Sequence, residues 1–303
     1  MRPYTLKQMQ TFVEVARQRS VSKAAERLFV TQPAVSMQIR QLEDAFGLAL
    51  IEPLGRNIQL THAGEAFLTH AIAALGQFKD LEALMAEHVG MKKGRIDLAV
   101  VSTAKYFVPM LLVRFRKLHP GIDIQLRIDN RENILGMMAR HEADLVVMGR
   151  APDHMDCQAT PFASNPLSIV AAPGHVLVRR KGLAFSALGE HGFVVREQGS
   201  GTRAALERLF AERRTPLNVE MEMPSNETIK QAVMAGMGLS FLSRRTMRHE
   251  LAHGYIALVD IEGTPLMGNW YVTHLSAKKL SPAARAFKDF LVEQGGALMD
   301  SWS

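Results

Sequence analysis

The sequence predicts an α+β protein with more than one domain. A length of 303 residues is enough for roughly two domains. The first ninety residues show mostly helical spacing of their apolar side chains, whereas strand-like and helix-like segments alternate from Arg95 onward. This alternation favours βαβ units with parallel sheets, and a span of about 210 residues is large enough for two subdomains.

Two short helices separated by a tight turn are predicted within the first fifty residues. Ser22 is placed to cap the first of them, over 23–28, and Thr31 to cap the second, which has Pro33 in its first turn. The second helix closes near Gly47, and its inward positions are Val35, Ile39, Leu42 and Phe46. This pattern is typical of a helix-turn-helix, here spanning Ser20 to Ile39. Residues 50–60 follow as two short strands around a Gly-Arg-Asn turn, which predicts a wing.

A long helix is expected next, from a cap at Thr61 to about Met91. Its mean apolar spacing is about 3.5 residues, which favours a coiled-coil seam between two chains over one helix packed on its own domain. A hinge is predicted at 90–94. The seam positions are Phe67, Ala71, Ala74, Phe78, Leu81 and Met85.

The C-terminal part is expected to place a ligand at the carboxyl ends of its strands. Helices are predicted at 106–118, 131–140, 202–213, 226–235 and 282–294. Strands are predicted at 96–101, 124–128, 145–148, 167–171, 192–195, 238–242, 256–259 and 270–273.

Composition excludes several classes of protein. The net charge of +6 is compatible with a polyanionic partner but is spread over the chain rather than concentrated in one segment. The single cysteine, Cys157, excludes an internal disulfide framework and any multi-cysteine metal site. No apolar run reaches the length of a membrane span, and the N-terminal residues contain no secretory signal. A cytoplasmic protein without membrane, metal or cofactor is therefore expected.

Two motifs suggest enzymes, and both are better explained as structure. His249-Glu250-Leu251-Ala252-His253 has the letters of a zinc-peptidase helix, but Gly254 follows at once. Residues 199–204 match a dinucleotide fingerprint, yet three residues separate them from the preceding strand. We expect no catalytic residues.

Several motifs resemble the N-terminal module of LysR-type transcriptional regulators: Phe12-Val13-Glu14-Val15-Ala16, Ser20 to Leu28, Thr31-Gln32-Pro33-Ala34-Val35-Ser36 and the Leu60-Thr61-x-Ala63-Gly64 segment. The resemblance covers essentially the whole chain. Residues 102–107, 148–150, 196–203 and 225–238 look like those of the regulators of Calvin-cycle carbon-fixation (RuBisCO) operons.

The resemblance implies a winged helix-turn-helix domain (1–60), a dimerising linker helix (61–92) and an effector-binding domain (93–303). It further implies two periplasmic-binding-protein-like lobes, lobe I over 93–162 with 268–303 and lobe II over 163–267. Homotetramers built from dimers are implied too, with RNA polymerase as a further candidate partner. The wing departs from the family pattern at Ile51, Pro53 and Asn57.

The DNA-binding hypothesis places the second helix of the motif in the major groove of promoter DNA. Gln32, Ser36, Gln38 and Arg40 would read base edges, and Pro33 and Met37 would contact thymine methyl groups. Arg56 and the region of Ser22 would contact phosphates. The alternative for these residues is an ordinary solvated helix face.

The effector hypothesis is a cleft that binds a small anionic, plausibly phosphorylated, metabolite at helix N-termini. The candidate residues are Ser102, Thr103, Arg150, Ser200, Thr202, Arg203, Asn226, Glu227 and Thr228. Ordinary helix capping is the alternative for each of them. The overall prediction is an activator of a carbon-fixation operon. The alternative hypotheses are a LysR-type regulator of another metabolic operon, a solute-binding protein and an enzyme.

Overall fold

The computed structural model describes residues 3–54, 57–88 and 94–301. The chain divides into two compact units, Met1–Val89 with Arg140–Glu142, and Gly90–Ala139 with Ala143–Ser303. We call them the N-terminal unit and the C-terminal unit.

Three helices begin the N-terminal unit: α1 (Leu6–Gln18), α2 (Val21–Leu28) and α3 (Gln32–Phe46). The second helix begins one residue before Ser22, the predicted cap, because the side chain of Ser20 accepts the hydrogen bond from the helix start. The prediction for this cap was therefore wrong by two residues. Ser22 lies in the first turn of α2 and is exposed.

The wing and the long helix follow α3. Strands β1 (Ile51–Leu54) and β2 (Asn57–Leu60) pair antiparallel, and α4 runs over His62–His88. The hydroxyl of Thr61 accepts a hydrogen bond from the backbone N–H of Gly64 at 3.0 Å, so the predicted cap of α4 is confirmed.

The apolar faces of these helices form one core. Phe12 of α1 and the α3 residues Val35, Ile39 and Leu42 are buried in it, and Phe67 of α4 packs against them. The aromatic rings of Phe12 and Phe67 meet edge to face with centroids 5.1 Å apart. The positions of α3 that helical spacing predicts to face inward are thus the ones that pack in this core.

The predicted seam of α4 divides into two parts. Ala71 is buried within the N-terminal unit itself. Farther along, Phe78, Leu81 and Met85 are 47%, 51% and 48% exposed, which is unusual for large apolar side chains spaced along one helix. The predicted hinge at 90–94 lies outside the described residues except for Gly94, which begins β3.

A mixed sheet organises the C-terminal unit. The strand order is β10-β6-β11-β5-β3-β4, with β9 also pairing with β6. The strands are β3 (Gly94–Val101), β4 (Ile122–Asp129), β5 (Leu145–Met148), β6 (Cys157–Ala171), β9 (Ser240–Ser243), β10 (Ala257–Leu258) and β11 (Leu266–Leu275). A separate parallel pair consists of β7 (Gly192–Arg196) and β8 (Asn218–Met223).

The expectation of parallel sheets is only partly correct. Strands β4 and β5 run parallel to β3, but β6 pairs antiparallel with β11, β9 and β10. Alternation of strands and helices cannot reveal a strand that returns from far along the chain. The sequence analysis also missed β8, which lies mostly exposed at an edge.

The C-terminal unit contains separate hydrophobic cores. One lies around β3, β5, α5 (Val108–Leu118), α6 (Arg131–Ala139) and α10 (Pro282–Phe290). The others lie around β7, β9, α7 (Gly201–Glu212) and α8 (Asn226–Met234). We call these regions the first and the second lobe, and β6 and β11 extend through both.

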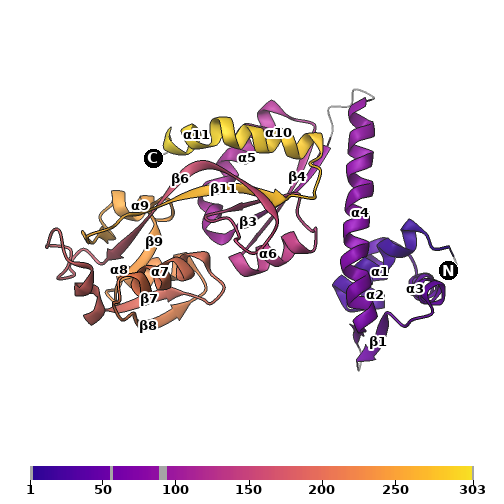
Figure 1. The fold of residues 1–303 in the computed structure, drawn as a ribbon, viewed down its shortest axis with the longest axis horizontal. Helices are drawn as coiled ribbons and strands as arrows, with labels where there is room; N and C mark the ends of the chain where they lie inside the picture. Colours follow the sequence, from indigo (N-terminus) through magenta and orange to yellow (C-terminus); the bar gives the residue numbers. More distant parts are fainter. Residues whose placement is uncertain (1–2, 55–56, 89–93, 302–303) are drawn as a thin grey trace. The chain divides into compact units, whose positions relative to one another are not determined.

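Shorter helices complete the C-terminal unit. They are η1 (Ser102–Tyr106), η2 (Phe185–Glu190), η3 (Arg244–Thr246), α9 (Arg248–Ala252), η4 (Leu291–Gly295) and α11 (Gly296–Ser301). Figure 1 shows α10 and α11 along one side of β6 and β11, with α7 and α8 beside β7 and β8.

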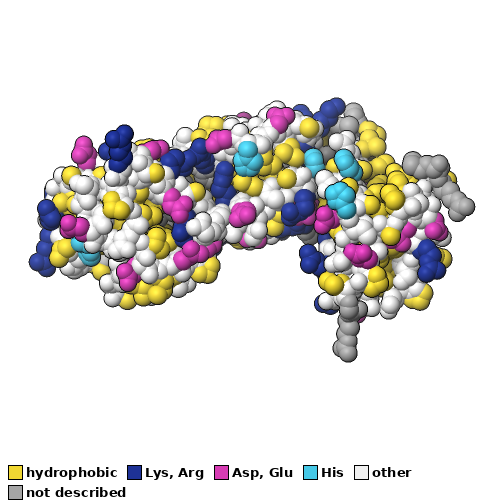
Figure 2. All heavy atoms as spheres, turned by 60° about the horizontal axis from the view of Figure 1, so that its bottom comes forward, with side chains coloured by type: hydrophobic (Ala, Val, Ile, Leu, Met, Phe, Trp, Pro, Cys, Tyr) yellow, Lys and Arg dark blue, Asp and Glu magenta, His cyan; other side chains and the backbone are white. Residues whose placement is uncertain are grey.

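Surface composition agrees with the even distribution of charge along the sequence. On the face shown in Figure 2, Lys and Arg side chains are interspersed with Asp and Glu rather than gathered into one patch. Within the described ranges, the structure contains no helix with the length and apolarity required to cross a bilayer.

Candidate functional site

The exposed face of α3 carries most of the predicted DNA-binding residues. Their side chains are accessible because the opposite face of the helix is buried in the core of the N-terminal unit. The exposed members are Gln32, Pro33, Ser36, Met37 and Arg40. Such a face combines amide, hydroxyl and guanidinium groups, which suit the edges of base pairs. The predicted wing residue Arg56 lies outside the described residues.

Three predicted DNA-binding residues already have partners inside the module. The hydroxyl of Ser22 donates to Oε1 of Gln32 at 3.2 Å, which links α2 to the start of α3. Gln38 is half-buried, and its Oε1 accepts a hydrogen bond from the hydroxyl of Thr11 on α1. Gln38 therefore contributes to the packing of α3 on α1. The side chain of Gln32 is exposed although its Oε1 also accepts a hydrogen bond, so Gln32 is more available to a base than the half-buried Gln38.

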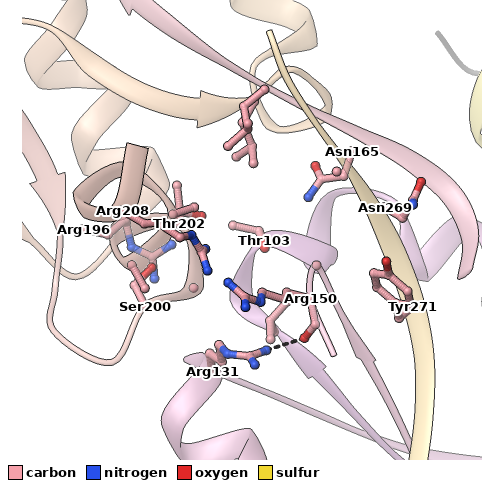
Figure 3. Close-up of a pocket in the computed structure, with 18 of the residues that line it drawn as sticks. Thr103, Arg131, Arg150, Asn165, Arg196, Ser200, Thr202, Arg208, Asn269 and Tyr271 are labelled. Atoms are coloured by element: carbon pink, nitrogen blue, oxygen red, sulfur yellow. Dashed lines mark hydrogen bonds between the residues drawn. The ribbon is translucent and has the colours of Figure 1, made fainter. Parts of the chain in front are cut away.

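A cavity of about 560 Å³ lies between the lobes of the C-terminal unit (Figure 3). Its wall comes from the ends of β3, β5 and β7, the first turns of α6 and α7, and the strands β6 and β11. Four guanidinium groups line it, from Arg131, Arg150, Arg196 and Arg208, against a single carboxylate. The surplus of positive charge suits a small anion. We call it the effector cavity.

Arg131 and Arg150 lie together at the first-lobe wall. Nη1 of Arg131 donates to the backbone carbonyl of Arg150 at 2.6 Å, drawn as the dashed line in Figure 3. Burial, and then the neighbouring charge of Arg150, lowers the pKa of Arg131. Arg150 pairs with Asp153 at 2.6 Å, but this pair is exposed and therefore weak.

Arg196 is the most enclosed of the four and connects the lobes. It ends β7 and is only 3% exposed. Its Nη2 donates to the hydroxyl of Ser102 in the first lobe at 3.0 Å, and its Nη1 donates to Oδ1 of Asn226 at 2.6 Å. The carboxylate of Glu197 bonds to its Nε and Nη2.

Five of the nine predicted effector residues line the effector cavity: Ser102, Thr103, Arg150, Ser200 and Thr202. The sequence analysis missed other polar lining residues, among them Asn165 on β6, Asn269 and Tyr271 on β11, and Arg131. Arg131 lies two residues after the end of β4, as Arg150 lies two residues after the end of β5, so the rule that selected Arg150 could have selected it. The residues on β6 and β11 carried no such signal.

Arg203 was predicted to face the ligand but does not line the effector cavity. It bonds instead to Glu207 at 2.7 Å, to Glu222 and to the carbonyl of Arg196 at 3.0 Å. Arg208, five residues farther along α7, lines the cavity. The cause is helical phase, since Arg208 lies two turns beyond Gly201, another lining residue, whereas Arg203 points elsewhere.

The three predicted residues at the start of α8 also lie outside the effector cavity. Asn226 is buried and accepts the hydrogen bond from Arg196, so it touches a lining residue rather than the cavity. Glu227 accepts a hydrogen bond from the hydroxyl of Tyr106. Thr228 is exposed on the same turn.

The two enzyme-like motifs have structural explanations. Gly199 has a φ of +79°, and a Cβ there would meet the Glu132 carboxylate at 2.5 Å. Its carbonyl accepts from the backbone N–H of Glu132 at 3.2 Å, so this glycine permits a close approach of the lobes. His249 and His253 lie on and just after the five-residue α9. The described residues include no cluster of three His, Cys, Asp or Glu side chains suited to a metal.

The structure thus combines a helix-turn-helix with an exposed polar helix and a two-lobed unit with a cationic cavity. Together these define a DNA-binding protein that responds to a small molecule. Residues 6–65 match the model of the lysR family of bacterial regulatory helix-turn-helix proteins, and residues 90–296 match the LysR substrate binding domain. The chain belongs to the LysR family of bacterial transcriptional regulators and is not an enzyme.

Curated relatives and a solved structure are similar over long stretches. The HTH-type transcriptional activator CmpR of Synechocystis is 43% identical over 96% of both chains. A RuBisCO operon transcriptional regulator of Allochromatium vinosum is 41% identical over 97% of both. The regulatory domain of CcmR from Synechocystis, solved in complex with 2-PG, is 40% identical with a TM-score of 0.64. The match covers 66% of this chain and 96% of that one.

The different roles of two arginines on α7 can be tested by Arg203→Met. We expect it to lower the free energy of unfolding of the C-terminal unit by about 1–3 kcal/mol, because the variant loses charge-assisted bonds at a buried position. Arg208→Met is the matched control, since Arg208 is exposed, and should change stability by less than about 0.5 kcal/mol. Urea unfolding measures both. Equal stabilities would contradict the structural role assigned to Arg203.

Proposed function

We propose that this LysR-type regulator activates transcription of a carbon-fixation (RuBisCO) operon in response to a small phosphorylated metabolite. The similarity to a RuBisCO operon regulator and to the activator CmpR, each over nearly the full length of both chains, supports the target and the sign of regulation. The complex of the CcmR regulatory domain with 2-PG supports the class of effector.

The observation that carries this proposal is the charge of the effector cavity. Four guanidinium groups around about 560 Å³ would be costly to hold together in an apolar site, and an anion with several oxygens would offset their repulsion. Ser102, Thr103, Ser200 and Thr202 add hydroxyl groups that can bond to the same oxygens. A cavity of this size accommodates a metabolite of a few carbon atoms with one phosphate.

For DNA recognition, we propose that α3 enters the major groove. Gln32, Ser36 and Arg40 would read base edges, with Gln38 as a weaker contributor because it is half-buried and bonded to Thr11 of α1. Pro33 and Met37 would contact thymine methyl groups. Ser22 and Arg56 would contact phosphates and set the register.

The assembly we propose is a homodimer through α4 that pairs into a homotetramer. The exposed apolar stretch at Phe78, Leu81 and Met85 supports the first contact, because a second copy of the helix would cover it. Exposed Val113 and Leu118 on α5 are compatible with a second contact. RNA polymerase is the further partner of an activator, and the cytoplasm is the compartment that holds both.

The domain map that fits this proposal has a DNA-binding domain at 1–60, a linker helix at 61–92 and an effector-binding domain at 93–303. Lobe I would cover 93–162 with 268–303, and lobe II 163–267. Strands β6 and β11 each extend through both lobes, which supports placing both boundaries between the lobes, at 162–163 and 267–268, within these strands.

Effector binding is tested with 2-PG on the full chain. Calorimetry should give saturable binding to the wild type, and Arg208→Met should weaken the affinity about tenfold or more because it removes a cation from the cavity wall. Arg203→Met should keep its affinity while it remains folded, since Arg203 does not line the cavity. Failure of 2-PG to bind the wild type would refute the proposed effector. Equal binding by Arg208→Met would refute the proposed site.

DNA recognition is tested by Gln32→Ala, with Gln41→Ala as the matched control on the same helix. Gln32→Ala should cost about 1–3 kcal/mol of specific binding to a RuBisCO operon promoter, because a base contact is lost. Gln41 accepts a hydrogen bond from Gln8 of α1, so its loss should leave the promoter affinity nearly unchanged. Gel-shift titrations at physiological salt against random duplex measure both. A wild-type chain that does not distinguish the promoter would refute the proposed target.

Self-association through α4 is tested by Leu81→Lys. A charge in the seam should raise the dissociation constant of the dimer about tenfold or more, because the ammonium group would lose its hydration in the interface. Leu54→Lys is the control, since Leu54 is an equally exposed leucine on the wing. Sedimentation velocity measures the assembly. An unchanged oligomer in Leu81→Lys would place the dimer contact elsewhere.

A further inference from the structure

The start of α8 was predicted to bind the effector, yet the structure gives it a different set of contacts. Asn226 accepts from Arg196, and Glu227 accepts from the hydroxyl of Tyr106 in the first lobe. Neither Asn226 nor Glu227 lines the effector cavity. Their polar groups therefore need an explanation other than direct contact with the ligand.

These contacts form a closed ring across the two lobes. Arg196 donates through one nitrogen to Ser102, at the first residue of η1, and through another to Asn226, at the first residue of α8. The last residue of η1, Tyr106, donates to Glu227, the neighbour of Asn226 in the chain. The ring thus passes from Arg196 along η1, across to α8 and back to Arg196.

The side of the ring at Tyr106 is reinforced by a buried cation. Lys230 is only 4% exposed, and its Nζ lies 3.1 Å from the Glu227 carboxylate and 2.7 Å from that of Glu250. The same Nζ lies 5.0 Å from the centre of the Tyr106 ring. These contacts restrict the orientation of both Tyr106 and Glu227.

Protonation states favour the direction of this hydrogen bond. Burial, together with the bond to Glu227, raises the pKa of Tyr106, so its hydroxyl remains a donor. Burial alone would raise the pKa of Glu227, but the hydrogen bonds from Tyr106 and Lys230 outweigh it and lower the pKa. Glu227 is therefore an ionised acceptor.

The ring of hydrogen bonds connects residues on the two faces of β6: Arg196 and Ser102 line the effector cavity, and Tyr106 and Glu227 line a cavity on the other face. Asn165 and Leu167 of this strand line the effector cavity, whereas Ser164 and Pro166 line a second cavity of about 890 Å³ that also contains Tyr106. Neighbouring residues of a strand point to opposite faces, so the two cavities lie on opposite sides of β6. One end of η1 thus reaches the effector cavity and its other end reaches the far side.

We propose that Asn226, Glu227 and Tyr106 are positioning residues for effector binding. They hold the Arg196 guanidinium and the start of η1, with Ser102 and Thr103, in the geometry that the anion meets. Because the ring spans both lobes, it also fixes their spacing at the effector cavity. The proposal rests on the proposed function insofar as it assumes that the anion binds in the effector cavity.

The physical basis is preorganisation. A guanidinium with free rotamers must be ordered when the ligand binds, and the free energy of that ordering is subtracted from the affinity. Arg196 is ordered beforehand because its nitrogens bond to Ser102, Asn226 and Glu197. Loss of the hydrogen bond between Tyr106 and Glu227 removes the link between η1 and α8 on this side of the ring. A fraction of the molecules then leaves the geometry that binds the effector.

The test uses the full chain with Tyr106→Phe, which keeps the aromatic side chain packed on Lys230 and removes only the hydroxyl group. We expect 2-PG affinity to fall about three- to tenfold, since the half-exposed Glu227 can bond to water instead. The melting temperature should stay within experimental error. Tyr255→Phe is the control, because Tyr255 is exposed and lines neither of the two cavities. Glu227→Gln keeps an oxygen acceptor and should retain more affinity than Glu227→Ala.

A readout without ligand keeps this test separate from the proposed function. Hydrogen–deuterium exchange of Tyr106→Phe should be faster than in the wild type over residues 102–106 and 226–230, and unchanged in α10. Unchanged exchange in the first two segments would overturn the proposal, whether or not 2-PG binds. Faster exchange with unchanged 2-PG affinity would overturn it as well. If 2-PG fails to bind the wild type, this result refutes only the proposed effector. The hydrogen–deuterium exchange result then tests whether the ring of hydrogen bonds orders η1 and α8.

Discussion

The antiparallel pairing of β6 with β11 is the constraint on which the C-terminal unit depends. The ladder runs from Leu167–Leu266 at one end to Cys157–Leu275 at the other. Strand β5 extends the sheet from β11 in the first lobe, and β9 and β10 extend it from β6 in the second. Two lobes with separate cores are therefore joined by the same pair of antiparallel strands, whose register shifts once, between Trp270 and Tyr271. This pairing limits the relative movement of the lobes to bending and twisting of the two strands.

Electrostatics then determines what the space between the lobes can bind. The guanidinium groups come from four different elements, so no local sequence concentrates them, and only folding brings their charges together. Asp153 and Glu197 compensate part of the positive charge of Arg150 and Arg196. The pKa of Arg131 is lowered by burial and by the charge of Arg150. A ligand that carries several negative oxygens relieves this repulsion, whereas a neutral ligand of the same shape would not.

Local signals predicted the fold of the N-terminal unit well, because helical spacing, caps and Pro33 act within a few residues of each other. Only part of the wall of the effector cavity follows from local signals. Ser102 and Arg150 follow strands that could be recognised, but Asn269 and Tyr271 lie on β11, whose pairing with β6 connects residues about 100 apart. Such pairing has no local signal. Arg203 lies near the start of α7 but does not line the effector cavity, because helical phase places it on a different face of the helix from Arg208.

The alternation of side chains along β6 has a consequence for how relatives of this protein could diverge. Asn165 and Ser164 are adjacent in the chain, yet each belongs to the wall of a different cavity. Point substitutions can therefore alter ligand selectivity on one side and the contacts between lobes on the other in separate steps. A one-residue insertion in this strand would exchange the two walls at once, so evolution of new specificities in this region should proceed by replacement rather than by changes in length.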